Sequence, residues 1–463
     1  MTAKMNIGLI GLGTMGRGLA HNLSGHGYKV MAYEPLAEKA QSPTGQFTVC
    51  KNLQELAESL SPPRTIVVLV KAGDPVDQMI GELSPHLKAG DMVIDGGNSH
   101  YLDTARRAGC LAEKGVHFFG VGISGGREGA RTGASIMAGG DEAAYPRIEP
   151  LLNDLAAPAK GGSCLAYIGP GGAGHFVKMA HNAIEYAMMQ IISETCLLGG
   201  RLGGLDHQRM ADVFAKWNRG AAGSYLVSIT ASILEKTDPE TGAPLLEVIS
   251  GTAGQKGTGG WAVAAAMELG VPVPTIAEAV AARDISAIVD EPSDGRRPPQ
   301  DVNLDALISD LEEAMTGAFI SAFDQGLALI AGGKRRHGWP VGMAEICRVW
   351  RRGCIIRAKL VERIGAAYEA EPELSNLLSD PGLAETLDNV QEGWRRTVAA
   401  AARAAIPVPA LGSALAYFDA LAGRGEGAAL IQGMRDFFGG HGLERAGQGG
   451  RLEVDWTEKQ ERS

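Results

Sequence analysis

The sequence predicts an α/β N-terminal domain, a large all-α second domain and an extended C-terminal tail. Short apolar segments alternate with amphipathic ones over the first third, which predicts a parallel sheet with helices on both faces. After about Gly174 long helical patterns dominate, and the final segment is rich in glycine and charge. We therefore divide the chain into residues 1–173, 174–423 and 424–463.

The expected elements follow from hydrophobic periodicity and from the residues that bound each segment. In the first domain, apolar runs bounded by glycine, proline or aspartate predict strands at 6–10, 29–33, 65–70, 92–94 and 117–119, with helices at 52–60 and 103–114. In the second domain we expect helices at 175–199, 260–269, 305–330 and 383–402. Several prolines make residues 291–301 a surface loop.

Composition excludes several classes of protein. The chain has 463 residues with 43 Lys and Arg against 53 Asp and Glu, and the formal net charge of −10 argues against a nucleic-acid binder. The six cysteines form no CxxC pair, so we expect no zinc site and a reducing, cytoplasmic location. No signal peptide is apparent, no stretch looks long enough to span a membrane, and we expect no membrane partner.

A glycine-rich fingerprint follows the first strand and opens a helix, in the sequence Gly11-Leu12-Gly13-Thr14-Met15-Gly16. The first glycine permits a tight turn, the second lets the backbone approach a pyrophosphate, and the third packs the helix on the strand. The helix N-terminus then faces the anion. The motif predicts a Rossmann-type dinucleotide-binding domain; the alternative is a glycine-rich turn of no consequence.

Glu34 closes the second expected strand, 23 residues after Gly11. A carboxylate there accepts hydrogen bonds from the adenosine ribose and repels a 2′-phosphate. Pro35 and Leu36 follow, so no arginine is offered to that phosphate. We therefore expect NAD as the cofactor, with NADP as the second choice. The alternative is that Glu34 is a solvated acid at a strand end with no role in binding.

A polar stripe runs along the first helix of the second domain. Its members recur at helical spacing, among apolar neighbours that indicate a buried helix, and they are Lys178, His181, Asn182 and Glu185, with Tyr186 at the edge. A buried polar stripe needs a partner. An exposed Lys–Glu face would be the alternative.

Three glycine-rich loops are candidate anion binders. They are Asp95-Gly96-Gly97-Asn98, Ser124-Gly125-Gly126 and Gly254-Gln255-Lys256-Gly257-Thr258-Gly259. The first two follow expected strands, and the exposed amides of the second could hold a carboxylate. The third combines a cation with a hydroxyl and suits a phosphate, although such a loop is weak evidence by itself.

Together these segments resemble the decarboxylating 6-phosphogluconate dehydrogenases, within the β-hydroxyacid dehydrogenase superfamily, over nearly the whole chain. The matching stretches are Val70-Lys71-Ala72-Gly73, Asp95 to Ser99, Ser124 to Arg131, Gly174 to Tyr186, Ala253 to Gly259, Trp350 to Arg357, and Arg435 to His441. The more distant β-hydroxyacid dehydrogenases share the first domain and the lysine, but they are shorter and lack the Glu-Tyr pair and the tail.

The resemblance implies roles for individual residues. Lys178 is the implied general base and Glu185 the implied general acid. The sugar-acid end of 6-phosphogluconate is assigned to Asn98, Ser124, Gly125, Gly126, His181 and Asn182. Its phosphate end is assigned to Tyr186, Lys256, Thr258, Arg283, Arg435 and His441. The last two come from the tail of the other subunit of a homodimer. The dinucleotide is assigned to Gly11, Leu12, Gly13, Thr14, Met15, Gly16, Glu34, Val70, Lys71, Ala72 and Asn98.

The chain departs from the family pattern in two places. Glu34-Pro35-Leu36 stands where the family commonly has Asn-Arg followed by Ser or Thr, which supports the expectation of NAD. Gly251 and Gly260 stand where the family often has Asp and Lys, so affinity at the phosphate end could differ.

The implied reaction oxidises 6-phosphogluconate at C3, releases CO2 and yields ribulose 5-phosphate without a metal. Burial and nearby cations would lower the pKa of Lys178, and an apolar setting would keep Glu185 protonated. Two alternatives remain: a non-decarboxylating hydroxyacid dehydrogenase, and a catalytically silent dinucleotide sensor. Retention of both Lys178 and Glu185 argues against the second.

Overall fold

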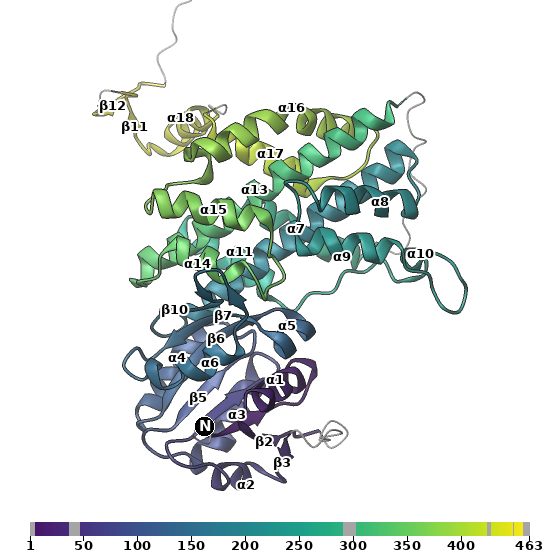
Figure 1. Ribbon diagram of the computed structural model, residues 1–463. Helices are drawn as coiled ribbons and strands as arrows, with labels where there is room; N and C mark the ends of the chain where they lie inside the picture. Colours follow the sequence, from purple (N-terminus) through teal and green to yellow (C-terminus); the bar gives the residue numbers. More distant parts are fainter. Residues whose placement is uncertain (1–4, 37–46, 290–301, 424–426, 448, 457–463) are drawn as a thin grey trace, which may run out of the picture. The chain divides into compact units, whose positions relative to one another are not determined.

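The computed structural model describes residues 5–36, 47–289, 302–423, 427–447 and 449–456, so the expected loop at 291–301 lies outside the described residues. The chain divides into two compact units, Met1–Leu415 and Ala416–Ser463. The first unit contains both the sheet and most of the helices (Figure 1).

The described part of the first unit contains an eight-stranded sheet in the order β10-β7-β6-β5-β4-β1-β2-β3. Its strands are β1 (Asn6–Ile10), β2 (Lys29–Tyr33), β3 (Thr48–Val49), β4 (Thr65–Val68), β5 (Met92–Asp95), β6 (His117–Ser124), β7 (Ser135–Gly140) and β10 (Leu165–Gly169). The five expected strands are confirmed, with ends that differ by a few residues.

The expectation of a wholly parallel sheet is wrong at one pair, because β7 runs antiparallel to β6. Only the short helix α5 (Gly126–Thr132) separates these strands. A parallel return requires a crossover of about a dozen residues or more, whereas an antiparallel neighbour can be reached by a short connection. The glycine-rich β7 and the edge strand β10 were not predicted at all.

Apolar clusters cover both faces of the sheet, as expected for an α/β domain. On β1, Ile7 and Leu9 belong to one cluster and Ile10 to the other, as the alternation of side chains in a strand requires. The first cluster includes residues of α1 (Thr14–Gly25) and α6 (Glu149–Leu155); the second includes residues of α2 (Leu53–Glu58), α3 (Asp74–Leu83) and α4 (Tyr101–Ala112). Two short strands, β8 (Pro158–Ala159) and β9 (Gly162–Ser163), pair with each other separately.

The strand order reverses at β1, which pairs with β2 on one side and β4 on the other. The loops that follow β1, β2, β4 and β5 therefore meet at the carboxyl edge of the sheet. In open α/β sheets, ligands bind at such a switch point.

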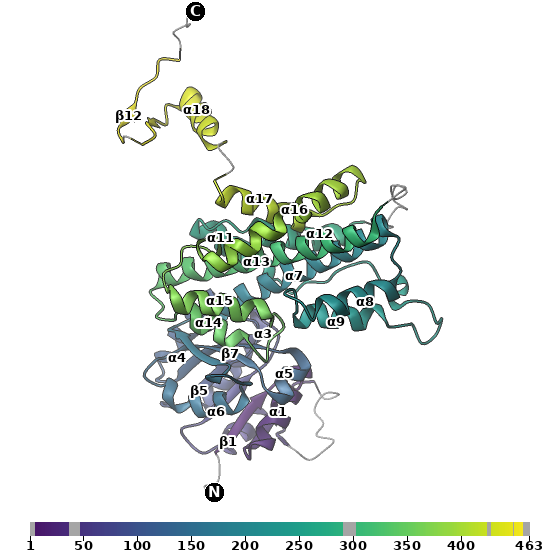
Figure 2. The same cartoon turned by 45° about the horizontal axis from the view of Figure 1, so that its top comes forward.

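Two long helices, α7 (Ala173–Gly203) and α13 (Leu304–His337), pack together at the centre of the helical part, and α16 (Pro381–Arg403) packs on α13 (Figure 2). The other helices of this part are α8 (His207–Trp217), α9 (Tyr225–Leu234), α10 (Leu245–Val248), α11 (Thr258–Leu269), α12 (Pro274–Ser286), α14 (Met343–Trp350) and α15 (Lys359–Ala370). The four long helices expected from the sequence are confirmed, with ends that differ by up to seven residues, most at the C-terminal end of α13.

Among the described residues, α13 is long and apolar enough to cross a membrane by length and composition, so the statement that no stretch reaches that length is wrong. Within its most apolar window, 83% is buried inside the protein. The core helix of a globular protein passes the same test, so this helix is weak evidence for a membrane span.

The second unit is not simply extended. After α17 (Pro409–Leu421) it contains α18 (Ala428–Gly439) and the strand pair β11 (Leu443–Glu444) and β12 (Arg451–Leu452). The Asp436 carboxylate accepts hydrogen bonds from the Gly442 amide at 2.6 Å and from the Trp456 indole at 2.9 Å, which closes this segment on itself. The expectation of a wholly extended tail is therefore corrected.

Candidate active site

The fingerprint forms the turn between β1 and α1. Gly11 has a φ of 97°, and a Cβ there would lie 2.3 Å from the Leu69 carbonyl oxygen. A Cβ on Gly16 would lie 1.9 Å from the Gly11 carbonyl oxygen, so neither position accepts a side chain. A Cβ on Gly13, the N-cap of α1, would meet no atom within 4 Å. Open space thus lies beside the helix N-terminus, where a pyrophosphate would be held.

Glu34 turns back over the fingerprint. Its carboxylate accepts hydrogen bonds from the Leu12 amide at 2.5 Å and from the Leu36 amide at 3.1 Å. These bonds fix a negative charge at the end of β2, next to the fingerprint loop. A carboxylate at this position would accept a hydrogen bond from a ribose hydroxyl of the dinucleotide.

A chain of close contacts leads from the fingerprint to the helical part. Gly11 abuts Leu69, and a Cβ on Gly96 would lie 3.1 Å from the Leu69 side chain. The Asn98 side-chain oxygen then accepts a hydrogen bond from Asn182 of α7 at 3.4 Å. The loops after β4 and β5, including Val70, Lys71 and Ala72, therefore lie between the fingerprint and α7.

Helix α7 starts directly on the backbone of β6 and β7. A Cβ on Gly174 would lie 2.4 Å from the Gly120 carbonyl oxygen, and one on Gly139 would lie 2.4 Å from the Gly174 amide nitrogen. A Cβ on Gly122 would lie 2.3 Å from the Cβ of Lys178. Glycines on both sides allow this approach, and it sets the position of Lys178 over β6.

Three titratable side chains of the polar stripe converge on α7. The Lys178 Nζ lies 3.4 Å from the His181 Nδ1, and the same Nδ1 lies 3.8 Å from the Glu185 Oε2. Lys178 is 6% exposed, His181 is fully buried and the Glu185 side chain is 22% exposed. The stripe predicted from helical spacing is therefore a recessed group of amine, imidazole and carboxyl.

Burial shifts the pKa of all three groups toward their neutral forms. Desolvation lowers the pKa of Lys178, although the nearby Glu185 opposes the shift. Desolvation and then the Lys178 charge hold the pKa of His181 well below its usual value. Desolvation raises the pKa of Glu185 against the opposing charges of Lys178 and Arg283. The site is thus biased toward a neutral amine beside a protonated carboxyl.

The loop after β6 meets the same group. The Ser124 hydroxyl lies 3.0 Å from the His181 Nε2, and the His181 Nδ1 lies 3.2 Å from the Asn182 side-chain oxygen. Gly125 and Gly126 follow with φ values of 125° and 58°, a conformation that favours glycine. All six residues expected at the sugar-acid end therefore lie on two neighbouring loops and on α7.

The expected phosphate-end residues of the first unit also come together. The Arg283 guanidinium stacks 3.5 Å over the Tyr186 ring and donates to the Gly254 carbonyl at 3.2 Å. Lys256 is exposed on the same glycine-rich loop, and Thr258 is buried at the start of α11. Helix α12 thus ties the loop to Tyr186, one residue beyond Glu185.

Arg435 and His441 lie in the second unit. Arg435 is exposed on α18 and donates to Gln432 at 3.0 Å, while the His441 ring lies edge-on to Phe438. Their relation to the other site residues stays a prediction.

Two neighbours of this group had no role in the sequence interpretation. The Trp350 ring lies edge-on to His181, with ring centroids 5.6 Å apart, and Cys354 is completely buried near the Lys178 charge. Burial raises the pKa of Cys354 to about 12. Both residues lie more than 140 positions beyond the end of α7, so helical periodicity could not have associated them with the stripe. Among the described residues there is no group of three or more His, Cys, Asp or Glu suited to a metal ion.

A dinucleotide fingerprint joined to a buried Lys–His–Glu group on the first helix of an all-α part defines the class: a nicotinamide-dinucleotide oxidoreductase. The family described as the NAD-binding domain of 6-phosphogluconate dehydrogenase matches residues 6–169, and the family of its C-terminal domain matches residues 174–456. The chain belongs to the 6-phosphogluconate dehydrogenase family.

Full-length relatives agree with this assignment. The chain is 43% identical to the decarboxylating 6-phosphogluconate dehydrogenase of Candida albicans, over 95% of this chain and 88% of the relative. It is 42% identical to the NADP(+)-dependent decarboxylating enzyme of Bacillus subtilis, over 98% and 99%. The solved 6-phosphogluconate dehydrogenase of Plasmodium falciparum superposes with a TM-score of 0.90 at 36% identity, over 97% of this chain and all of that one.

Proposed function

We propose that the chain oxidises 6-phosphogluconate at C3 and decarboxylates it to ribulose 5-phosphate and CO2, with reduction of a nicotinamide dinucleotide. The observation that carries the proposal is the Lys178–His181–Glu185 group, which pairs an amine of lowered pKa with a carboxyl of raised pKa. The relatives' names supply the substrate and the decarboxylation.

Lys178 acts first, as general base. In its neutral form it takes the proton of the C3 hydroxyl while the hydrogen on C3 leaves as hydride. The fingerprint residues 11–16, Glu34, Val70, Lys71, Ala72 and Asn98 would hold the dinucleotide, which would supply the hydride acceptor. The products of this step are a 3-keto acid and the ammonium form of Lys178.

Loss of CO2 follows because the new ketone lies β to the carboxylate. The electron pair of the breaking C1–C2 bond moves into a C2–C3 enol, whose oxygen Lys178 protonates and thereby stabilises. Glu185 then donates its proton to C2, which becomes C1 of the product, while Lys178 takes back the enol proton. The protonated carboxyl that this step needs is the form that burial favours.

We assign the two ends of the substrate to the two sides of this group. Asn98, Ser124, Gly125, Gly126, His181 and Asn182 hold the sugar-acid end, supported by their hydrogen bonds to one another and to α7. Tyr186, Lys256, Thr258 and Arg283 hold the phosphate end, where cations and a hydroxyl gather. Arg435 and His441 complete the phosphate end from a second subunit.

The reaction is tested by initial rates with 6-phosphogluconate and each dinucleotide, with CO2 detected in parallel. We expect reduced dinucleotide and CO2 in equal amounts. Reduced dinucleotide without CO2 would instead indicate a non-decarboxylating hydroxyacid dehydrogenase. A folded protein that binds dinucleotide but turns over neither substrate class would indicate the silent sensor.

We propose NAD as the preferred cofactor, with NADP as the weaker one. The Bacillus subtilis relative is named as NADP(+)-dependent, whereas Glu34 places a carboxylate beside the fingerprint of this chain. A carboxylate at this place accepts hydrogen bonds from the ribose hydroxyls and repels a 2′-phosphate. The double substitution Glu34→Asn and Pro35→Arg should shift the ratio of kcat/KM values toward NADP by about 10²-fold, as the loss of a repulsive contact and the gain of a charged hydrogen bond predict. An unchanged ratio would refute the assignment.

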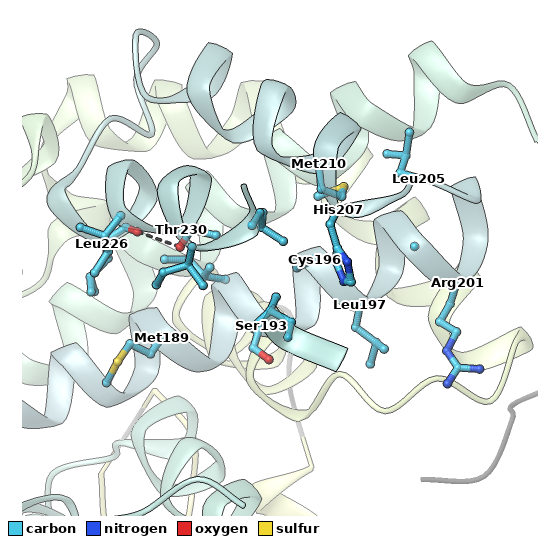
Figure 3. A pocket seen from close by; sticks show the side chains of 16 residues that line it. Met189, Ser193, Cys196, Leu197, Arg201, Leu205, His207, Met210, Leu226 and Thr230 are labelled. Carbon is cyan, nitrogen blue, oxygen red and sulfur yellow. Dashed lines mark hydrogen bonds between the residues drawn. The ribbon is translucent and has the colours of Figure 1, made fainter. Parts of the chain in front are cut away.

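We propose that the chain forms a homodimer in which the tail of each subunit reaches the other. The support is an exposed apolar surface on α18, where Leu430, Phe437 and Phe438 are 66–74% exposed. An apolar groove of about 610 Å³ between α7, α8 and α9 is of the kind that such a helix would cover (Figure 3). Met189, which lines this groove, lies about one helical turn beyond Tyr186 of the proposed phosphate end.

The dimer is tested by sedimentation of the chain and of the variant Phe437→Ser with Phe438→Ser. We expect a dimer for the first and a shift toward monomer, with loss of activity at low protein concentration, for the second. Dimers of unchanged stability and activity in the variant would exclude tail exchange through this helix.

We also propose a cytoplasmic location and the division into residues 1–173, 174–423 and 424–463. All six cysteines are described and none is paired, in agreement with a reducing compartment. The boundary at 173 falls beside the start of α7, where the sheet is complete.

A further inference from the structure

A buried polar cluster lies beneath the two loops that approach α7, and the reaction described above gives its members no role. The cluster consists of Asp95 at the end of β5, Thr104 and Arg107 on α4, and His175 in the first turn of α7. Each is at most 2% exposed. Charged and polar groups that are this deeply buried need partners, so their hydrogen bonds indicate what the cluster does.

Asp95 shapes the loop that carries Asn98. One carboxylate oxygen accepts the Gly97 amide at 3.0 Å, and the other accepts the Ser99 hydroxyl at 2.6 Å. The two bonds hold the residues on either side of Asn98. The direction of the Asn98 side chain toward Asn182 therefore depends on Asp95.

Arg107 connects this loop with the loop after β4. Its Nη1 lies 3.8 Å from the Asp95 carboxylate, and its Nη2 donates to the Gly73 carbonyl at 3.1 Å. Its Nε and Nη2 also bind both oxygens of Asp77 on α3, at 3.0 and 2.7 Å, and the Arg107 hydrogen bond is the main reason that the pKa of Asp77 falls to about 2. One guanidinium thus spans the loops after β4 and β5, between the fingerprint and α7, where the proposed dinucleotide would present its nicotinamide end.

His175 connects the same helix α4 with the catalytic helix. Its Nδ1 lies 2.7 Å from the Thr104 hydroxyl, and Thr104 is three residues before Arg107 on α4. Lys178 lies three residues, or nearly one turn, beyond His175 on α7. A single face of α4 is therefore linked to Gly73, to the Asn98 loop and to the turn that precedes the base.

We propose that Arg107 and His175 are positioning residues, which together with Asp95 and Thr104 set the distance between the nicotinamide-side loops and Lys178. The proposal rests on the proposed function, because the distance matters only if hydride moves between substrate and dinucleotide at this place. A misplacement of about 1 Å at a reacting centre can cost about 10²-fold in rate. The cluster is far enough beneath the surface to act only through the loops and α7.

The chain offers matched controls. Arg106 also binds Asp77, at 2.9 Å, but its side chain is 53% exposed and contacts neither loop. Thr132 makes a hydrogen bond to the carbonyl four residues earlier, as Thr104 does, but it is exposed and has no histidine partner. Two comparisons distinguish an effect on positioning from the general effect of losing a side-chain group. Arg107→Met is compared with Arg106→Met for the loss of a charge, and Thr104→Val is compared with Thr132→Val for the loss of a hydroxyl.

The experiment measures kcat, KM for the dinucleotide, and the isotope effect with substrate deuterated at C3, in folded variants matched by circular dichroism. For Arg107→Met we expect kcat to fall by about 10–100-fold, a larger isotope effect because hydride transfer becomes slower, and partial recovery in Arg107→Lys. Arg106→Met should match the unchanged protein. Thr104→Val should follow Arg107→Met in direction, and Thr132→Val should not.

Two outcomes overturn the proposal. If Arg107→Met only melts at lower temperature, with kcat and isotope effect equal to those of Arg106→Met, the cluster is structural alone. If Arg107→Met does not fold, Thr104→Val and Arg107→Lys carry the same comparison. If the unchanged protein fails to oxidise 6-phosphogluconate, the proposed function is rejected. The positioning of the loops is then tested separately by titrating NADH binding through its fluorescence. Equal dissociation constants for Arg107→Met and Arg106→Met would reject loop positioning as well.

Discussion

Helix α7 carries two recessed glutamates, Glu185 and Glu194, whose surroundings differ. Desolvation raises the pKa of both carboxyls. Glu194 accepts the amides of Ala410 and Leu411 at 2.9 and 2.8 Å, where α17 begins, and a hydrogen bond from Gln190 at 3.0 Å. Within the part of the chain that the structure describes, the Glu185 carboxylate accepts no hydrogen bond; it lies 3.8 Å from the His181 ring and near the charges of Lys178 and Arg283.

The difference shows that burial and a raised pKa do not by themselves identify a catalytic acid. The oxygens of Glu194 are occupied by backbone donors, so that carboxyl stabilises the start of another helix. The oxygens of Glu185 remain available to a substrate. The predictions below test this distinction.

The largest effect should come from the proposed base, Lys178. We expect Lys178→Met to lower kcat by about 10³-fold, because the amine that takes the C3 proton is lost. Substrate binding should stay within about tenfold, since the phosphate and sugar-acid contacts remain. Stopped-flow measurement of dinucleotide reduction checks the rate, and turnover at the level of the unchanged protein would reject Lys178 as the base.

The two glutamates should respond in opposite ways to the same substitution. Glu185→Gln should lower kcat by about 10²-fold with little change in melting temperature, because the proton donor is removed and no backbone bond is lost. Glu194→Gln should leave kcat nearly unchanged and lower the free energy of unfolding by about 1–3 kcal/mol, because an amide group then faces a backbone N–H. Kinetics and thermal unfolding of both variants provide the comparison, and a lower kcat in Glu194→Gln with normal stability would contradict it.

The pH dependence should separate the same two residues. Lys178 must be neutral, so kcat/KM falls as pH drops below its lowered pKa; Glu185 must be protonated, so kcat/KM falls as pH rises above its raised pKa. The resulting profile is bell-shaped. In Glu185→Gln the alkaline limb should disappear while the acid limb stays, whereas Glu194→Gln should keep both limbs.

The smallest effect should come from the outer partner of Glu194. Gln190→Ala removes one hydrogen bond to a carboxylate that keeps two backbone donors, so we expect a loss of about 1 kcal/mol in unfolding free energy. Activity should not change. A decrease in kcat comparable to that of Glu185→Gln would indicate that the two carboxyls are coupled along α7.

Local sequence patterns were sufficient for the features that depend on neighbouring residues. The spacing of Lys178, His181 and Glu185 on an otherwise apolar helix gave the stripe, and the fingerprint in its strand–helix context gave the turn that Gly11 and Gly16 form. Glu34 was assigned from its place at the end of β2, and its bond to Leu12 agrees with that place.

Features that depend on distant partners could not be predicted in this way. The role of Glu194 becomes visible only with Ala410 and Leu411, which lie 216 and 217 residues away. Strand β7 was missed because its glycines weaken the strand pattern, although they are needed where α7 approaches. In the tail, α18 was hidden by the glycines on either side of it and by an apolar face that is exposed.

The glycine contacts under α7 have a consequence for how this protein can change over evolution. Side chains in a core rotate and exchange volume, whereas the backbones of Gly120, Gly139 and Gly174 pack against one another with no room for a side chain between them. Substitutions among the surrounding apolar residues should therefore change the distance of Lys178 from the sheet very little. Substitutions in the loops can change which acid substrate or dinucleotide is bound, while the Lys178 amine keeps its position relative to the sheet.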